Sequence, residues 1–388
     1  MKIAIPKERR LHERRVAATP DTVKKFIALG MDVTVEAGAG DASRITDENY
    51  RAAGASVVAE LASVLADADI VLKVQRPLLA GEGDVNELSL MKRGAILVAM
   101  LSPYSEPNAL RAYADARVTT MTLEFVPRIT RAQSMDVLSS QSNLAGYRAV
   151  LEAINVYDRA MPMMMTAAGT IAPARVMVLG AGVAGLQAIA TAKRLGAIVS
   201  ATDVRAASKE QVESLGGKFV MVESEETKQA ETKGGYAKEM SDDYKRRQAE
   251  LVAETLKKQD IAICTALIPG RKAPTLINDE MVHSMRPGSV IVDLAAEQGG
   301  NCTLTKPGEV VEINGVTIIG LFNIPSRLSA DASALYAKNV LNFITPLVDA
   351  NSKQLAINWQ DEIVAATTLT RDGSIVHPNF APASPSAT

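Results

Sequence analysis

The sequence predicts an α/β protein with two Rossmann-like, doubly wound parallel-sheet domains separated by a cleft. In the first third of the chain, strand-like apolar runs alternate with helical stretches, which is typical of a parallel sheet covered by helices. Between Val176 and Arg205 an apolar strand, a glycine-rich turn, a helix and a second strand follow one another. The length of 388 residues is sufficient for two domains with separate cores.

The N-terminal domain is predicted from short apolar runs that have the length and composition of strands. These runs are Lys2 to Ile5, Asp32 to Glu36, Ile70 to Val74, Ala95 to Met100 and Thr119 to Thr122. Helical stretches such as Thr22 to Leu29 and Pro107 to Ala114 separate them. Because a helical connection normally joins parallel strands, we expect one parallel sheet here.

A long amphipathic helix is predicted between Arg128 and Arg159, where apolar residues recur at helical spacing. Ser139 or Ser140 could cap its N-terminus, because a serine hydroxyl accepts hydrogen bonds from the first free amides of a helix. We interpret this helix as the link between the two domains.

The second domain is expected to contain the glycine-rich unit and three further strands, at Ile261 to Thr265, Ser289 to Asp293 and Thr317 to Leu321. After Pro325 another helix, Ala332 to Leu347, is expected to return to the first domain. The predicted boundaries are 1–138 with about 330–380 for the first domain and 139–329 for the second. A tail at 381–388, rich in Pro, Ala and Ser, is expected to be flexible.

The glycine-rich unit has the features of a dinucleotide site. Gly180 ends the strand in a tight turn, Gly182 lets backbone amides approach a pyrophosphate, and Gly185 lets the helix pack closely. Asp203 follows Gly185 by eighteen residues and ends the second strand, where its carboxylate can accept the ribose hydroxyls of NAD. It would repel a 2′-phosphate, which favours NAD(H), although Arg205 could also meet a phosphate.

A polar block, RITRAQSMDVLSSQSN, precedes the linking helix at residues 128–143. Arg128 can pair with a phosphate or with Asp136, and Gln133 offers a donor and an acceptor to a carboxamide. The block is therefore a candidate for the nicotinamide end of a cofactor. A solvated interdomain loop with a capped helix explains its composition equally well.

A charged segment at residues 223–248 contains a glycine pair and Tyr236 but few core residues. Its length and glycines are typical of a mobile loop that closes over a site. A surface helix with paired charges is the alternative, and composition alone favours that alternative.

The composition excludes several classes of protein. A net charge of -2 provides no basic field, so we expect no nucleic-acid partner. The chain opens on its first strand without a signal peptide, and no run of about 18 apolar residues follows, so no direct membrane insertion is expected. Cys264 and Cys302 show no metal-ligand spacing, which predicts no metal and fits a reducing cytosol.

Few residues are candidates for a catalytic base. The chain has 3 histidines, none of them in a motif, whereas oxidation of an alcohol or amine requires a proton acceptor beside the hydride acceptor. Hydride exchange between two nicotinamides moves no proton at the reacting carbons. The composition is therefore compatible with such an exchange. Arg15 and Lys73 could form an anion site, or each could be an ordinary surface cation.

Several motifs together resemble the alanine dehydrogenase and NAD(P) transhydrogenase superfamily over nearly the whole chain. They are IPKE at Ile5, RRVAATP at Arg14, KVQRP at Lys73, the GAGVAG turn, DVR at Asp203 and IVDLAAEQGGN at Ile291. In alanine dehydrogenases, residues matching Arg15 and Lys73 hold the substrate. Those enzymes also have a catalytic histidine where this chain reads SPYSEP from Ser102, and an aspartate where Glu297 aligns.

The polar block and the segment KGGYAKEMSDDY are instead similar to the NAD(H)-binding domain of proton-translocating transhydrogenase. The resemblance implies a nicotinamide-end role for Arg128, Gln133, Asp136 and Ser139, and a loop-closing role for Tyr236. It further implies the following cofactor-binding residues: Arg128, Ile129, Gln133, Val137, Leu138, Ser139, Gly180, Gly182, Val183, Gly185, Asp203, Val204, Arg205, Gly235, Gln248, Ala266 and Leu267.

The resemblance also implies partners. In that family the domain binds NAD(H) and exchanges hydride with NADP(H) on a separate NADP-binding subunit, while a transmembrane subunit couples the transfer to proton movement. We therefore expect a cytoplasmic peripheral subunit that forms a homodimer and attaches to the inner membrane through the complex. The alternatives are an alanine-type amino-acid dehydrogenase and a non-catalytic NAD-binding module.

Overall fold

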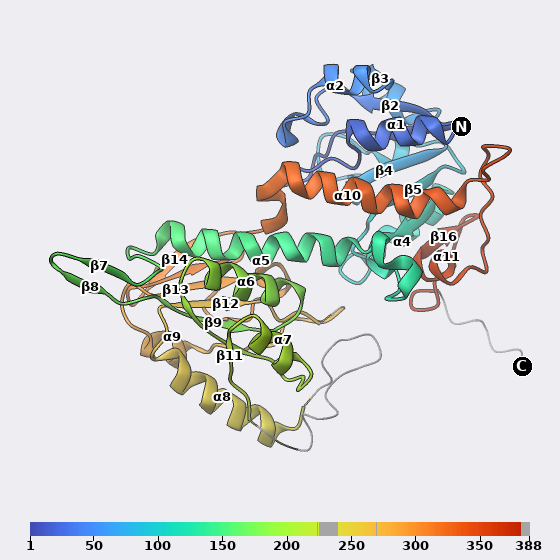
Figure 1. The fold of residues 1–388 in the computed structure, drawn as a ribbon. Coiled ribbons are helices and arrows are strands. Elements are labelled where there is room, and N and C mark those ends of the chain that lie inside the picture. The colour runs from blue at the N-terminus through green and yellow to red at the C-terminus, as the bar shows by residue number, and fades with distance from the viewer. Residues whose placement is uncertain (223, 225–239, 269, 382–388) are drawn as a thin grey trace, which may run out of the picture. The chain divides into compact units, whose positions relative to one another are not determined.

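A computed structural model describes residues 1–222, 224, 240–268 and 270–381 (Figure 1). The chain divides into two compact units. Unit 1 comprises Met1–Gln141 and Leu328–Thr388, and unit 2 comprises Ser142–Arg327. Each unit contains one large, mostly parallel sheet, so the predicted α/β class is confirmed.

The sheet of unit 1 has the order β17-β16-β6-β5-β4-β1-β2-β3. Its strands are β1 (Lys2–Ile5), β2 (Asp32–Glu36), β3 (Ser56–Val58), β4 (Ile70–Gln75), β5 (Ile96–Met100), β6 (Thr119–Thr122), β16 (Thr368–Arg371) and β17 (Ser374–Ile375). The strands from β3 to β6 are parallel, and β16 and β17 continue the sheet antiparallel. Segments from both ends of the chain therefore share one sheet.

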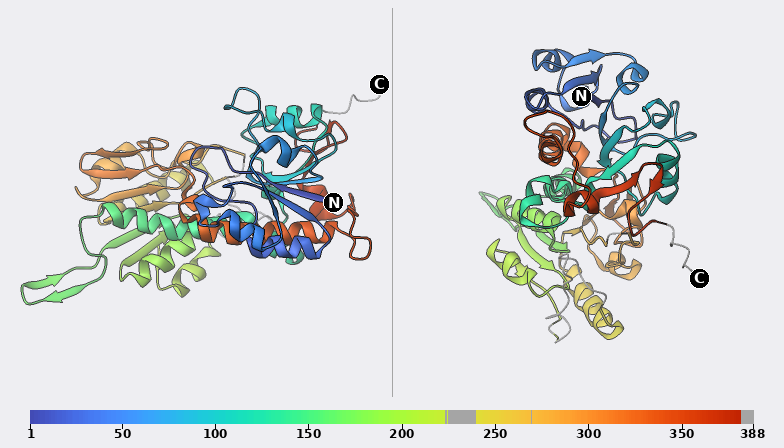
Figure 2. Two further views of the ribbon diagram at one scale, coloured as in Figure 1. Left: turned by 90° about the horizontal axis from the view of Figure 1, so that it is seen from above. Right: turned by 90° about the vertical axis from the view of Figure 1, so that its right-hand side faces the viewer.

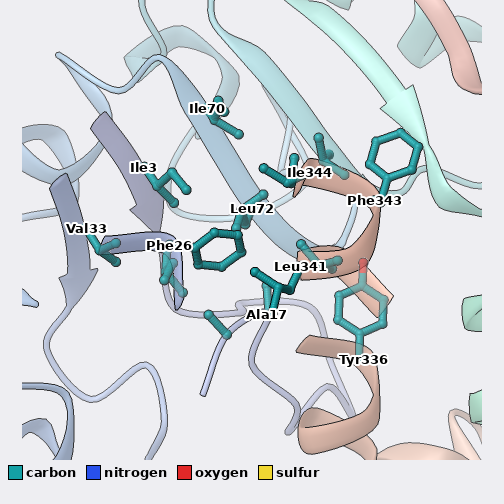
Figure 3. Close-up of a cluster of buried hydrophobic side chains, with 14 of the residues drawn as sticks. Ile3, Ala17, Phe26, Val33, Ile70, Leu72, Tyr336, Leu341, Phe343 and Ile344 are labelled. Carbon is teal, nitrogen blue, oxygen red and sulfur yellow. The ribbon is translucent and has the colours of Figure 1, made fainter. Parts of the chain in front are cut away.

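Helices from both ends of the chain also share the core of unit 1. The helices are α1 (Pro20–Ala28), α2 (Asp47–Ala52), α3 (Leu61–Leu65), α4 (Pro107–Asp115), α10 (Ser329–Ile344) and α11 (Glu362–Thr367). Figure 3 shows Phe26 of α1 and Leu341 of α10 beside Leu72 of β4. The hydroxyl of Tyr336 donates to the carbonyl of Lys73 at 2.8 Å, which joins α10 to β4. Because the two contributions bury one apolar cluster, unit 1 needs the C-terminal segment to complete its core.

The helix α5 (Val137–Val156) begins earlier than its serines predicted. The backbone amide of Ser139 donates to the carboxylate of Asp136 at 2.9 Å, so Asp136 rather than Ser139 or Ser140 caps the first turn. The predicted serine caps are therefore wrong. A carboxylate directly before the helix can satisfy the same amide and also suits the positive end of the helix dipole.

The sheet of unit 2 has the order β11-β10-β9-β12-β13-β15-β14. Its strands are β9 (Arg175–Leu179), β10 (Ile198–Thr202), β11 (Lys218–Phe219), β12 (Ile261–Cys264), β13 (Val290–Asp293), β14 (Val310–Ile313) and β15 (Val316–Ile319). All neighbours pair parallel except β14 with β15. The helices are α6 (Val183–Arg194), α7 (Ser208–Ser214), α8 (Asp242–Leu256) and α9 (Asp279–Ser284).

A two-stranded hairpin in unit 2 has no counterpart among the sequence predictions. Strands β7 (Met164–Thr166) and β8 (Gly169–Ile171) pair with each other and with no other strand of the described chain. Figure 2 shows the hairpin standing away from the sheet of unit 2. All six strand residues are exposed, and Met165 keeps 81% of its surface accessible.

Short 3-10 turns complete the described chain. They cover Asp41–Ser43, Leu88–Leu90, Leu123–Phe125, Thr130–Met135, Ala296–Gln298, Ile324–Leu328 and Thr345–Leu347. Within the described residues, no helix combines the length and the apolar character needed to cross a membrane.

Candidate functional site

The order of strands in unit 2 creates a topological switch point. Strand β10 pairs with one edge of β9, and β12 pairs with the other edge. The chain therefore leaves β9 toward one side of the sheet and later returns on the other side. In open α/β sheets, ligands bind in the crevice beyond the carboxyl ends of the strands at such a point. The predicted glycine turn follows β9 directly.

The glycine turn has little space for larger residues. Gly180 has a φ of +105°, a conformation that favours glycine. A Cβ atom on Gly185 would lie 1.8 Å from the carbonyl oxygen of Gly180, so α6 can pack this closely only with glycine. Gly182 differs, because no heavy atom lies within 4 Å of a Cβ built there. It precedes the first turn of α6, where free amides and the helix dipole favour an anion.

The acid at the end of β10 is held by two neighbours. Asp203 accepts hydrogen bonds from the backbone amide of Ala181 at 2.8 Å and from that of Arg205 at 2.9 Å. The guanidinium of Arg205 binds both carboxylate oxygens, through Nε and Nη2 at 2.8 Å. Arg205 therefore forms an ion pair with Asp203, and a 2′-phosphate would have to break that pair to use the arginine.

The strand on the other side of the switch point supplies the opposite wall. The hydroxyl of Thr265, just after β12, donates to the carbonyl of Gly180 at 2.9 Å. The next residues are Ala266 and Leu267, and Leu267 is 41% exposed. Val183, the first residue of α6, is 37% exposed. Large apolar side chains thus remain accessible beside the glycine turn, as expected for the wall of a nucleotide site.

Helix α8 connects to the same edge of the sheet. The side chain of Gln248 donates to the hydroxyl of Thr202 at 2.6 Å and accepts from the backbone amide of Val222 at 3.1 Å. Val204 packs against a small apolar cluster formed by Met240 and Tyr244. Gln248 therefore holds α8 next to the strand end that carries the predicted ribose-binding acid.

The predicted loop at 223–248 is only partly covered by the described residues. Residues from Asp242 onward form α8, and the hydroxyl of Ser241 caps that helix by accepting from the amide of Tyr244. Gly235 and Tyr236 lie outside the described residues.

The predicted nicotinamide-end residues lie together in unit 1, on the turn Thr130–Met135 and the start of α5. Arg128 and Gln133 are exposed, whereas Asp136 and Ser139 are partly buried. The hydroxyl of Ser139 donates to the carboxylate of Asp136. Of the neighbouring apolar residues named above, Ile129 and Leu138 pack against the core and Val137 is fully buried.

Helix α10 holds this polar block from behind. The side chain of Asn339 donates to the carbonyl of Ser134 at 2.8 Å and accepts from the hydroxyl of Ser140 at 2.8 Å. Asn342 donates to the same carbonyl at 3.1 Å. These asparagines are separated from the block by about two hundred residues, so no spacing pattern in the chain indicated them.

The basic residues Arg15 and Lys73 are buried in unit 1 rather than on the surface. The guanidinium of Arg15 forms an ion pair with Glu13, with Nη2 to Oε2 at 2.7 Å. The ammonium of Lys73 lies 3.3 Å from a carboxylate oxygen of Glu8 and 3.1 Å from one of Glu87. Both cations therefore have carboxylate partners within the chain.

Burial changes the protonation of one of these carboxyl groups. Loss of water raises the pKa of Glu8 from 4.5 to about 7, although the nearby ammonium of Lys73 opposes the rise. The carboxylates of Glu13 and Glu87 raise the pKa further through repulsion. One oxygen accepts from the amide of Val74 at 2.6 Å, whereas the other has no hydrogen-bond donor among the described residues.

The two sequence-predicted groups thus fall in different units, with the polar block in unit 1 and the dinucleotide residues in unit 2. Sequence reasoning missed Thr265, which lies at the carboxyl end of a predicted strand. A hydroxyl at that position could have been noticed, because strand ends at a switch point line the ligand crevice. Together, the switch point, the glycine turn and Asp203 make unit 2 a dinucleotide-binding type of α/β domain.

The comparisons with known proteins agree with this class. Residues 4–145 match the family described as "Alanine dehydrogenase/PNT, N-terminal domain", and residues 149–378 match the corresponding C-terminal domain. The chain belongs to the alanine dehydrogenase/PNT family, which confirms the resemblance inferred from the motifs.

Two relatives and one solved structure illustrate the similarity. The first of the separate chains that make up NAD(P) transhydrogenase subunit alpha in Rhodospirillum rubrum is 58% identical, over 97% of this chain and 98% of the relative. A structure described as a transhydrogenase from Sinorhizobium meliloti has a TM-score of 0.87 and 52% identity, and the match covers 97% of this chain and all of that one. The alanine dehydrogenase of Methanococcus maripaludis is 31% identical, over 92% of this chain and 90% of the relative.

Proposed function

We propose that this chain is the NAD(H)-binding subunit of a proton-translocating NAD(P) transhydrogenase. It would bind NADH and deliver hydride to NADP⁺ held by a separate NADP-binding subunit, while a transmembrane subunit couples the transfer to proton movement. The observation that carries the proposal is the similarity to transhydrogenase alpha chains over nearly the full length of both proteins. The dinucleotide geometry of unit 2 supports it independently.

The residues of unit 2 fit the binding of NAD(H). The amides at the start of α6 would face the pyrophosphate, and Asp203 would accept the adenosine ribose hydroxyls in place of part of its contact with Arg205. Ala266, Leu267 and Gln248 would complete the walls. Bound NADH supplies the hydride, and the chain itself orients the cofactor and excludes water.

Replacing Asp203 by asparagine is expected to weaken NADH binding by about tenfold to a hundredfold, because one charge-assisted acceptor is lost. Discrimination against NADPH should fall as well, since the repelling carboxylate is gone and Arg205 loses its ion-pair partner. Fluorescence titration with both nucleotides measures the two effects. The control is Asp242→Asn, which changes an exposed carboxylate at the start of α8. An unchanged preference for NADH in Asp203→Asn would contradict the role of Asp203.

The polar block of unit 1 is proposed to orient the nicotinamide end. Arg128, Gln133, Asp136 and Ser139 would hold the donor ring, and Tyr236 would close over it. The exposure of Arg128 and Gln133 supports this role, because their polar groups are accessible to a ligand or partner. The pairing of Ser139 with Asp136 supports a fixed arrangement of the block.

Gln133→Leu is expected to slow hydride transfer by about a hundredfold while NADH affinity changes by less than about threefold. The reason is that orientation of the reacting ring affects the transfer step, whereas most binding contacts belong to unit 2. Single-turnover kinetics with the NADP-binding partner and an NADH titration measure the two quantities separately. The neighbouring Ser134→Ala serves as the control. An equal loss of rate and affinity would exclude an orienting role.

An alanine dehydrogenase reaction is disfavoured by the buried cluster of unit 1. A substrate carboxylate would need Arg15 and Lys73, but Glu13 engages the arginine, and Glu8 and Glu87 engage the lysine. We therefore expect no oxidation of NADH when the chain alone receives pyruvate and ammonium. The same preparation should bind NADH more tightly than NADPH in a titration. Turnover of pyruvate without a partner would overturn the proposed function.

The chain is also proposed to act as a homodimer, and the hairpin β7–β8 supports an interface. Met163, Met164, Met165 and Ile171 are all exposed there, and an isolated two-stranded hairpin is marginal in water. Met165→Asp is expected to shift the mass measured by sedimentation velocity from dimer to monomer. The control, Val310→Asp, places a charge on the exposed edge strand β14. A dimeric Met165→Asp protein would exclude the hairpin as the essential contact.

The remaining parts of the proposal concern location. We propose that the chain lies in the cytoplasm and attaches to the inner membrane through the membrane subunit of the complex. The relative in Rhodospirillum rubrum, whose name describes one portion of a subunit alpha, supports a chain that works together with other subunits.

A further inference from the structure

The loop after β13 contains a buried asparagine that none of the predicted site residues includes. Asn301 follows two glycines with positive φ, Gly299 at +93° and Gly300 at +75°. Its side chain is fully buried. A buried amide that lacks hydrogen-bond partners costs about 1–3 kcal/mol, so its partners explain why it is tolerated.

The side-chain amide of Asn301 binds both polar groups of one backbone residue. Its Oδ1 accepts from the amide of Ala266 at 3.1 Å, and its Nδ2 donates to the carbonyl of Ala266 at 2.9 Å. The same Nδ2 donates to the carbonyl of Pro274 at 2.8 Å. Asn301 thus replaces a neighbouring strand for Ala266 at the point where β12 has ended.

The backbone of Asn301 is fixed from the other side. Its amide donates to Oδ2 of Asp293 at 2.8 Å, and the amide of Cys302 donates to the same oxygen at 3.0 Å. The hydroxyl of Thr305 adds a third bond to this oxygen at 2.7 Å. A Cβ atom on Gly300 would lie 2.9 Å from that oxygen, so glycine allows the close approach.

The contacts continue from Ala266 to the glycine turn. Thr265, the preceding residue, donates its hydroxyl to the carbonyl of Gly180 at 2.9 Å. A continuous path therefore runs from Asp293 through Asn301, Ala266 and Thr265 to Gly180. Both walls of the switch-point crevice, after β9 and after β12, are connected by this path.

We propose that Asn301 is a positioning residue of the dinucleotide site, which rests on the proposed NAD(H)-binding function. It fixes the peptide groups of Ala266 so that the backbone at Ala266 and Leu267 and the turn at Gly180 keep the spacing that the ligand requires. It does not contact the reacting atoms and acts through Ala266.

Asn301→Asp tests the proposal, because it keeps the shape of the side chain but removes both donated hydrogen bonds. At pH 8 the carboxylate oxygen would face the carbonyls of Ala266 and Pro274 and repel them. We expect the Kd for NADH, measured by fluorescence titration well below the melting temperature, to rise at least tenfold. Lowering the pH toward 5 should restore part of the affinity, since a protonated carboxyl group can donate again.

The controls separate this inference from general damage and from the proposed function. Asn314→Asp makes the same change in the exposed turn between β14 and β15 and should leave the Kd unchanged. If Asn301→Asp does not fold, Thr265→Val removes the next bond of the path and should raise the Kd several-fold with little change in melting temperature.

Wild-type affinity in folded Asn301→Asp at pH 8, or in Thr265→Val where Asn301→Asp cannot fold, would overturn the positioning role while the wild type still binds NADH. Failure of the wild type itself to bind NADH would overturn the proposed function and this inference together.

Discussion

Gly185→Ala is expected to abolish measurable NADH binding and to destabilise unit 2 by about 3 kcal/mol or more. The added Cβ would lie 1.8 Å from the carbonyl oxygen and 2.9 Å from the carbonyl carbon of Gly180. Both neighbours are backbone atoms, so α6 must move away from the turn to accept the methyl group. The turn carries the amides that would bind the pyrophosphate, and its displacement removes the site together with the packing.

Gly182→Ala is the matched control for this prediction. No heavy atom lies within 4 Å of a Cβ at this position, and the φ of -80° suits any residue. We expect a normal melting temperature but weaker NADH binding, because the methyl group enters the space needed by the pyrophosphate. Thermal unfolding followed by circular dichroism is the appropriate measurement, since the single tryptophan, Trp359, lies in unit 1. Equal melting temperatures for wild type, Gly182→Ala and Gly185→Ala would contradict the packing argument.

Glu8→Gln is expected to flatten the dependence of unit 1 stability on pH. Burial raises the pKa of Glu8 above its unfolded value, from 4.5 to about 7, so the folded state holds this proton more tightly than the unfolded state. The stability that the protonated group contributes is complete below about pH 4.5 and is lost as the pH rises through about 7. The difference amounts to about 3 kcal/mol at most.

Urea unfolding at pH 5.5 and pH 8, followed by the fluorescence of Trp359, measures this effect in the unit that contains Glu8. The wild type should lose more free energy of unfolding between the two pH values than Glu8→Gln does. Glutamine has no proton to release, and Lys73 keeps Glu87 as a partner. Glu124→Gln is a useful comparison, because burial also raises the pKa of Glu124, but that carboxylate has several hydrogen-bond donors. Identical pH dependence in the wild type and Glu8→Gln would contradict a raised pKa at Glu8.

The central strands of both sheets were predicted well, because buried parallel strands are continuous apolar runs with clear ends. The bounds of β1, β2 and β6 match their predictions. The predicted helix at Ala332 to Leu347 instead begins at Ser329 and ends at Ile344. Pro346 lacks the amide needed to continue it, so the last residues form a 3-10 turn.

The hairpin β7–β8 was missed because its residues, MMTAAGTI, lack the alternation of apolar and polar side chains that indicates a half-buried strand. The wrong cap of α5 has a similar origin, because the sequence offered three acceptors within five residues and no means to choose among Asp136, Ser139 and Ser140.

Local spacing was sufficient to predict the conformation of the glycine turn and the place of Asp203, because those residues lie within one βαβ unit. The ion pair between Asp203 and Arg205 changes the expected state of that carboxylate. The partners of Lys73 and the support of Ala266 by Asn301 join residues far apart in the chain. Such contacts depend on the assembled sheet and leave no spacing pattern in the sequence.

The proposed hydride transfer can be measured as absorbance-monitored reduction of an NAD analogue by NADPH, using this chain mixed with its NADP-binding partner. We expect rapid reduction only when both proteins are present, and none with either protein alone. A chain that binds NADH but never supports this transfer in the mixture would be a non-catalytic NAD-binding module. That result would contradict the proposed function.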